Sequence, residues 1–332
     1  MQTGREGKGA ERADGEDVIM VKAAQRMYYG KALAKLAERK EIVVLDADLG
    51  GSTRTSDFAK VAPERFIQIG IAEQNMIGVA SGLAAAGKTV FASTFAVFAT
   101  GRCWEQIRQA VAYPKLNVKI VATHCGISVG GDGASHQALE DIAIMRALPN
   151  MIVISPADAN EAYAATMAIA DLKGPCYMRM GRADFPLITS EGVKFEIGKA
   201  AVLRNGNDVT LIGTGQMVMS CIEAAGILEQ NGISAEVINV STIKPLDSET
   251  ILASVSKTKC VVTAEEHSII GGLGSAVAEC LSENRPTPQI RVGVKDSFGE
   301  SGDPGELMKK YGLTTDDVIK AAENVIGKKG KK

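Results

Sequence analysis

The sequence predicts an α/β fold with two domains, each a mostly parallel β-sheet covered by helices. Three observations support this prediction. Short apolar stretches alternate with longer amphipathic ones, and strands that are apolar throughout are typical of sheets buried on both faces. The segment 184–192 interrupts this alternation, which then starts again. A chain of 332 residues, 45% hydrophobic and 23% charged, is also long enough for two hydrophobic cores.

In the first half of the chain, the elements follow from the spacing of apolar residues. Residues 21–39 have the pattern of an amphipathic helix, and 72–86 form a helix of small residues that ends at Gly87, a residue suited to a helix C-terminus. Further helices are predicted over 104–112, 136–148 and 160–172. Strands are predicted where apolar residues run together, at 41–46, 89–95, 118–122, 151–155 and 176–179.

The second half repeats this organisation after the segment 184–192, which we interpret as a linker. Its predicted strands, separated by helices, are 209–213, 235–240, 259–264 and 289–294. We therefore expect four regions: a disordered N-terminal tail over 1–17, a first domain over 18–188, a second domain over 189–326 and a basic tail over 327–332.

Charge and cysteine content narrow the classes of function. A formal net charge of -2 gives no electrostatic basis for binding nucleic acid, and the lysines that close the chain are typical of a solvated terminus. No apolar stretch has the length of a membrane span, and the first residues are polar rather than signal-like. Six cysteines are scattered without a Cys-x-x-Cys pair, which argues against a zinc site or a disulfide framework. We expect a soluble cytoplasmic protein without a membrane partner.

The first candidate site combines one acidic and two aromatic residues. Glu73 begins a predicted helix, and Phe95 and Phe98 lie where the next strand ends. Glutamate is common at helix N-termini because of the helix dipole, and phenylalanine is common in cores. However, α/β folds hold their ligands at this edge of the sheet, and the residues at 93–94 and 100–102 are mostly polar. A carboxyl group beside two aromatic rings suits a planar nitrogen heterocycle.

The second candidate site is a glycine-rich loop over residues 123–137, which carries two of the three histidines. His124 and His136 flank Asp132, and a loop between a strand and a helix with such residues favours function over packing. The histidine spacing does not fit zinc, so we favour substrate binding and proton transfer. Gly131-Asp132-Gly133 followed by Asn150 is similar to a magnesium–diphosphate signature, but its spacing is too short, and we predict no metal site here.

Two turns in the second half carry weaker signals. The glycines near residues 213 and 215 lack the third glycine and the acid of a dinucleotide site. Glu265-Glu266-His267, followed by glycines at 271, 272 and 274, predicts a turn into a helix near a subunit interface.

With these residues identified, the chain over 18–326 resembles the C-terminal half of transketolase. The motifs that carry the resemblance are Asp48-Leu-Gly-Gly-Ser52, Gly70-Ile-Ala-Glu73, Thr94-Phe95-Ala-Val-Phe98, His124, Asp132-Gly-Ala-Ser-His136 and Tyr177-Met-Arg179. Transketolases contain a diphosphate-binding domain, a pyrimidine-binding domain and a smaller C-terminal domain, and this sequence is similar to the last two only. The resemblance therefore implies the short subunit of a split transketolase. Its partner, the N-terminal subunit, is expected to carry the diphosphate-binding domain and Mg²⁺, with two copies of each subunit in the complex.

The resemblance implies a thiamine diphosphate site shared between the two subunits. Glu73 is expected to hydrogen-bond a ring nitrogen of the aminopyrimidine, which requires a proton on the carboxyl group. Burial against Phe95 and Phe98 favours that protonated form. The cofactor serves as the electron sink for a two-carbon unit transferred from a ketose phosphate to an aldose phosphate.

One position departs from the family pattern. Gly101 replaces the third aromatic residue on the pyrimidine side. Two alternatives follow: the cofactor clamp is looser at this position, or Arg102 and Trp104 complete it.

The resemblance also implies where the substrate binds. The positions that match sugar-phosphate ligands are Arg26, Ser52, His124 and Arg179. A pair of guanidinium groups with a hydroxyl suits a phosphate dianion, because charge-assisted hydrogen bonds are the stronger ones. Asp132 and His136 match positions that contact the substrate hydroxyls and transfer protons at the donor carbonyl, so Glu73, His124 and His136 are the expected catalytic residues.

Other readings of the same residues stay open. Deoxyxylulose-phosphate synthases and the β subunits of 2-oxoacid dehydrogenases share parts of the pattern, although His124-Cys-Gly argues against the first and the loop Asp132 to His136 against the second. A non-catalytic scaffolding paralogue is a further alternative. Retention of Glu73 and both histidines weighs against that alternative.

Overall fold

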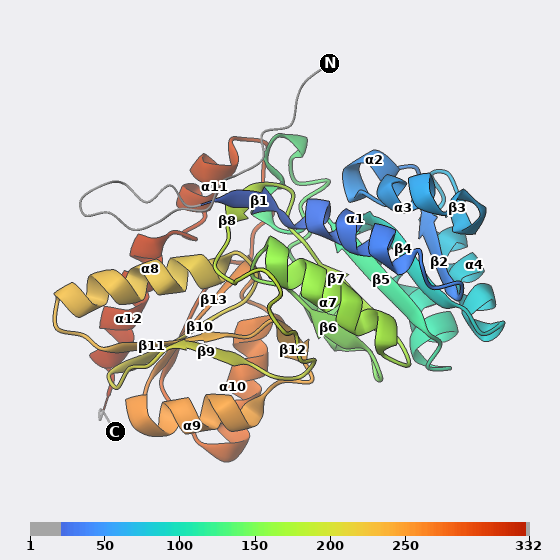
Figure 1. Ribbon diagram of the computed structural model, residues 1–332. Coiled ribbons are helices and arrows are strands. Elements are labelled where there is room, and N and C mark those ends of the chain that lie inside the picture. The colour runs from blue at the N-terminus through green and yellow to red at the C-terminus, as the bar shows by residue number, and fades with distance from the viewer. Residues whose placement is uncertain (1–20, 330–332) are drawn as a thin grey trace.

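The computed structural model describes residues 21–329 and confirms the predicted α/β class (Figure 1). Two sheets, one of seven strands and one of five, are each covered by helices, and a small two-stranded sheet joins β1 (Lys22–Ala24) to β8 (Asp184–Pro186). The predicted tail over 1–17 and residues 330–332 of the predicted basic tail lie outside the described residues.

The seven-stranded sheet has the order β12-β6-β7-β5-β4-β2-β3, and only its edge strand β12 runs antiparallel to its neighbour. Its strands are β2 (Ile42–Asp46), β3 (Phe66–Gln68), β4 (Thr89–Phe95), β5 (Val118–Thr123), β6 (Ile152–Ile154), β7 (Cys176–Arg179) and β12 (Thr242–Lys244). Because the first six strands run parallel, their carboxyl ends meet at one edge, where a ligand site is expected.

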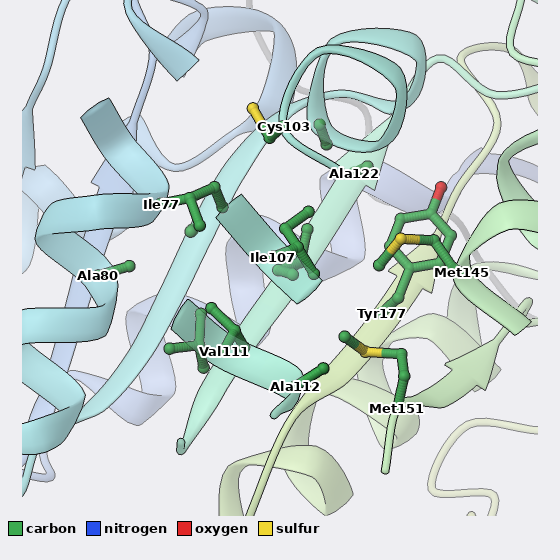
Figure 2. Packing of buried hydrophobic residues seen from close by; sticks show 14 of the residues in the cluster. Ile77, Ala80, Cys103, Ile107, Val111, Ala112, Ala122, Met145, Met151 and Tyr177 are labelled. Atoms are coloured by element: carbon green, nitrogen blue, oxygen red, sulfur yellow. The ribbon is translucent and has the colours of Figure 1, made fainter. Parts of the chain in front are cut away.

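Helices cover both faces of this sheet. One face carries α1 (Gln25–Leu36), α3 (Ser56–Val61) and α7 (Ala159–Asp171), with the short α2 (Gly50–Thr53) and η1 (Pro63–Arg65) at its edge. The other face carries α4 (Glu73–Ala85), the π-helical turns η2 (Phe98–Arg102) and η3 (Ile107–Ala112), α5 (Trp104–Gln106) and α6 (Asp141–Arg146). Figure 2 shows Ile77 of α4, Ile107 of η3 and Ala122 of β5 in this core.

The five-stranded sheet forms the second layered unit (Figure 1). Its order is β14-β13-β10-β11-β9, with only β9 antiparallel to its neighbour. The strands are β9 (Ala201–Arg204), β10 (Val209–Gly213), β11 (Ala235–Asn239), β13 (Val261–Ser268) and β14 (Gln289–Val294). The helices are α8 (Met217–Gln230), α11 (Pro304–Lys310) and α12 (Thr315–Ile326) around one core, and α9 (Ser248–Thr258) and α10 (Leu273–Asn284) around the other.

Three predicted elements differ because of pairing between distant segments. The predicted helix over 21–39 begins only at Gln25, since residues 22–24 form β1 and pair with β8. The predicted linker over 184–192 therefore contains a strand. The predicted helix over 136–148 shortens to α6, because Ala138 forms a bridge with Cys125 and accepts a hydrogen bond from the Gly126 backbone at 2.9 Å.

The strand β12 was not predicted. It belongs to the second half of the chain by sequence but extends the first sheet, where Thr242 pairs with Ile154 of β6. Three residues are too few for a periodic signal, so only the partner strand identifies this one. Among the helices of residues 21–329, none combines the length and apolarity needed to cross a membrane.

Candidate functional site

The predicted acidic residue lies at the carboxyl edge of the seven-stranded sheet. Glu73 is the first residue of α4, and the turn that precedes the helix uses Gly70 at φ +78°, a conformation that favours glycine. The side chain is 4% exposed. Its two carboxylate oxygens both accept hydrogen bonds from Nη1 of Arg102, each at 2.9 Å. Glu73 is therefore buried and paired with a half-exposed guanidinium group.

The pairing adds a neighbour to those that the sequence predicted for this carboxyl group. Phe95 and Phe98 were the expected neighbours. Arg102 reaches Glu73 as well, from η2.

Four aromatic rings gather beside this ion pair. Phe95 ends β4, and its ring stacks on that of Phe98 with centroids 5.9 Å apart and on that of His124 with centroids 3.7 Å apart. His136 contacts both phenylalanines edge-on, at 6.2 and 5.3 Å. The Arg102 guanidinium carbon lies 4.5 Å from the Phe98 centroid, in a cation–π arrangement. The structure thus brings both predicted motifs into one site.

His124 is held as a neutral imidazole. It directly follows β5, at φ +60°, and its Nδ1 lies 2.8 Å from Oγ1 of Thr123. Burial, with the charges of Arg26 and Arg182 and the nearby His136, lowers the pKa of His124 to about 3. At neutral pH this ring can donate one hydrogen bond and accept another. A further cationic charge at this position is disfavoured by the two arginines.

Those two arginines line an open pocket of about 250 Å³, whose walls also include Ser128 and the acidic Asp184. Nη1 of Arg26 donates to the Ser52 carbonyl at 3.0 Å, while its buried Nε finds no acceptor among residues 21–329. Burial, then the neighbouring Arg182, lowers the pKa of Arg26. Positive charges that are crowded together, with one unpaired donor, are suited to an anion.

Arg182 was not predicted, and Arg179 does not belong to this pocket. Nε and Nη2 of Arg179 donate to Asp141 at 2.7 and 3.1 Å, and the side chain is almost fully buried. Burial alone lowers the pKa of Arg179, but the Asp141 carboxylate outweighs it and raises that pKa above its ordinary value. The Tyr177 hydroxyl donates to the same carboxylate at 2.6 Å. Arg179 is therefore a buried structural ion pair, which corrects its assignment as a phosphate ligand.

Arg182 could have been found from its place after the strand. It lies three residues beyond the end of β7, following Gly181, at the same edge as Glu73 and His124. Its Nη1 donates to the Val129 carbonyl at 2.8 Å and lies 3.6 Å from a carboxylate oxygen of Asp132. The motif used for the sequence prediction ends at Arg179, the last residue of the strand. That side chain faces the interior.

The remaining predicted residues lie on the loop that follows β5. We call residues 124–137 the substrate loop; it contains the 3-10 helix η4 (Ile127–Asp132). Asp132 is exposed, and Nδ1 of His136 lies 2.9 Å from the Ser135 hydroxyl. Asn150, the distant half of the rejected magnesium signature, donates to the Ala112 carbonyl at 3.0 Å.

Comparison with known proteins adds independent findings. Residues 21–186 match the family described as "Transketolase, pyrimidine binding domain", and residues 198–318 match "Transketolase, C-terminal domain". The chain is 46% identical to the 6-deoxy-6-sulfo-D-fructose transketolase subunit SqwH of Clostridium sp. (strain MSTE9), covering 91% of this chain and 94% of that one.

Two solved structures are similar to the chain as well. One, a "Split gene transketolase, inactive beta4 tetramer", is 54% identical with a TM-score of 0.86 and covers 92% of this chain and 98% of its own. The other, the Pichia stipitis transketolase in complex with sedoheptulose 7-phosphate, is 26% identical with a TM-score of 0.78. It aligns with 93% of this chain, which spans only 46% of that protein.

Proposed function

The chain belongs to the transketolase family, and we propose that it is the C-terminal subunit of a split, thiamine diphosphate-dependent transketolase of the cytoplasm. In this proposal, the enzyme moves a two-carbon ketol unit from a ketose phosphate to an aldose phosphate. The observation that carries it is the convergence of Glu73, Phe95, Phe98 and the two histidines at one edge of the sheet. A helix-dipole role for Glu73 gives no reason for four rings to gather there.

The donor set fits the pyrimidine end of thiamine diphosphate. A buried carboxyl group suits a ring nitrogen, and the stacked Phe95 and Phe98 rings suit an aromatic face. The cofactor, when bound, supplies the electron sink for the two-carbon unit. For Glu73 to bind the ring nitrogen, Arg102 has to leave the carboxylate.

The anionic end of the sugar is assigned to Arg26 and Arg182, with the neutral His124 as a hydrogen-bonding neighbour. Two guanidinium groups bind any tetrahedral oxyanion, so a phosphate and a sulfonate are both suitable. Ser52 takes part through its backbone, which already accepts from Arg26 at 3.0 Å. Asp132 and His136 are assigned to the sugar hydroxyls and to proton transfer, because Asp132 is exposed on the substrate loop and His136 is partly exposed beside the Phe95 and Phe98 rings.

The proposal requires a second subunit. This chain aligns with less than half of the Pichia stipitis enzyme and matches only the pyrimidine-binding and C-terminal families. We propose that an N-terminal subunit brings the diphosphate-binding domain and Mg²⁺, and that two copies of each subunit assemble. Thiamine diphosphate then lies between the two kinds of subunit.

Substitution of Glu73 tests the proposal directly. In the complex with the partner subunit, Glu73→Ala is expected to lose nearly all ketol transfer from xylulose 5-phosphate to ribose 5-phosphate. Glu64→Ala is the matched control, because that glutamate lies on the surface 67% exposed. Turnover of the Glu73 variant within a few-fold of the parent would refute the assigned role.

Cofactor titration tests the shared site. Thiamine diphosphate with Mg²⁺, followed by calorimetry, should bind weakly to this chain alone and tightly once the partner is added. Tight Mg²⁺-dependent binding by the lone chain contradicts the shared site. Turnover with pyruvate and no ketose phosphate would instead assign the chain to a synthase-type reaction.

A further inference from the structure

The substrate loop is anchored in the C-terminal domain as well as in the sheet that precedes it. The Ile127 and Leu139 side chains, at the beginning and just beyond the end of the loop, are buried in the hydrophobic cluster of the C-terminal domain. Leu139 also accepts a backbone hydrogen bond from Ser268, at the end of β13, at 2.7 Å. Both ends of the segment that carries Asp132 and His136 therefore pack into another domain.

A buried carboxyl group supports the first part of the loop from below. Glu266 of β13 is 4% exposed, and its Oε1 accepts the backbone N–H of Ser128 at 2.6 Å. The fit is close, since a Cβ added to Gly126 would lie 2.3 Å from this carboxyl group. Gln216, from the turn before α8, donates to the Ser128 hydroxyl at 3.1 Å. Burial raises the pKa of Glu266 to about 7.

The segment 298–304 supports the second part of the loop from outside. The Ser301 hydroxyl donates to the Gly131 carbonyl at 2.7 Å, and a Cβ on Gly133 would lie 3.4 Å from the Ser301 backbone nitrogen. The Gln137 amide donates to the Glu300 carbonyl at 2.9 Å and to the Ile127 carbonyl at 3.1 Å. These contacts flank Asp132 on both sides.

We propose that the C-terminal domain acts as a support that sets the position of Asp132 and His136, with Glu266 and Ser301 as its positioning residues. Neither residue contacts the proposed substrate; each acts through the backbone of the substrate loop. The proposal rests on the assigned function of this site and adds a role for the second domain in it. Displacements of about 1 Å in a catalytic group cost about 100-fold in rate, so the loss of either support is measurable.

Kinetics of two variants test the proposal in the complex with the partner. Glu266→Leu removes the acceptor for Ser128, and we expect kcat/KM to fall about 10- to 100-fold while the cofactor concentration for half-maximal activity stays unchanged. Glu266→Gln, which keeps an acceptor oxygen, is expected to recover most of that loss. A merely structural role predicts instead a lower fraction of active enzyme with unchanged KM.

The second variant avoids a folding defect, since Ser301 is on the surface. Ser301→Ala is expected to lower kcat/KM several-fold, whereas Ser282→Ala, an exposed serine on α10, is the control and should leave it unchanged. If Glu266→Leu folds and both variants stay within twofold of the parent, the proposal is overturned.

Amide hydrogen exchange separates this proposal from the proposed function. Without substrate or cofactor, Ser301→Ala is expected to accelerate exchange of the amides at 126–133 several-fold relative to the parent, with no change in the strands of either sheet. Unchanged exchange there overturns the support role, even if ketol transfer is observed. Faster exchange in a complex without ketol transfer retains the support role and rejects only the proposed function.

Discussion

Arg179 and Arg182 lie three residues apart in sequence, but we expect their substitution to have different effects. Loss of Arg179 should lower stability, and loss of Arg182 should weaken substrate binding. Each is changed to Met, which keeps the unbranched side chain and removes the charge. In Arg179→Met, the Asp141 carboxylate stays buried and loses its guanidinium partner. It keeps the hydrogen bond from the Tyr177 hydroxyl at 2.6 Å. The substitution also removes two contacts to the Glu266 carbonyl at 3.3 Å.

The expected magnitudes follow from burial. Breaking a buried ion pair by removing one partner costs about 3–5 kcal/mol, because the other charge remains desolvated. We expect Arg179→Met to lower the free energy of unfolding by that amount. Arg182 is 43% exposed and 3.6 Å from an exposed carboxylate, so Arg182→Met is expected to cost less than about 1 kcal/mol.

Urea denaturation measures this difference, with fluorescence of Trp104, the single tryptophan, as the probe. In the complex with the partner, Arg182→Met is expected to raise KM for the ketose phosphate at least tenfold, since one of two guanidinium groups is lost from the anion pocket. Equal urea midpoints for the two variants would refute the structural role of Arg179. A raised KM in Arg179→Met with parental stability would restore its assignment as a phosphate ligand.

Three further predictions concern stability. Burial raises the pKa of Glu266 from its ordinary 4.5 to about 7 in the folded protein. The contribution of this group to the free energy of unfolding is therefore fully present below pH 4.5 and is lost as the pH rises through 7. Between pH 5 and 8, paired urea titrations should show the parent losing roughly 2 kcal/mol of unfolding free energy relative to Glu266→Gln. Asp158→Ala removes the N-cap of α7 and the acceptor of three backbone N–H groups. It should lower the free energy of unfolding by about 2–4 kcal/mol in urea denaturation. A loss below about 1 kcal/mol contradicts this expectation. Gly126→Ala is expected to lower the thermal midpoint more than Gly192→Ala, because both glycines have positive φ (79° and 76°) but only the first faces the Glu266 carboxyl group; equal shifts would contradict the close fit.

The sequence was sufficient for the features that depend on short-range patterns. Helix and strand periodicity is local, so the alternation of elements predicted the fold class and the position of Glu73 at a helix start. Parallel strands share one carboxyl edge, so residues that follow strands meet there. For this reason Phe95 and His124 could be predicted to lie near Glu73, and the structure stacks these two rings with their centroids 3.7 Å apart.

Only the tertiary structure decided which polar residues face the site and which are buried. Arg179 and Arg182 are the same residue type, with Arg179 the last residue of β7 and Arg182 three residues beyond it. Asp141, 38 residues away in sequence, pairs with Arg179 and leaves Arg182 in the pocket. Arg102 pairs with Glu73 across 29 residues, and Glu266 reaches Ser128 across 138. Such pairings depend on the direction of the side chain at each strand end and on the domain that packs beside that strand end. Local periodicity encodes neither the direction nor the neighbouring domain, because both are fixed only when the two sheets pack together.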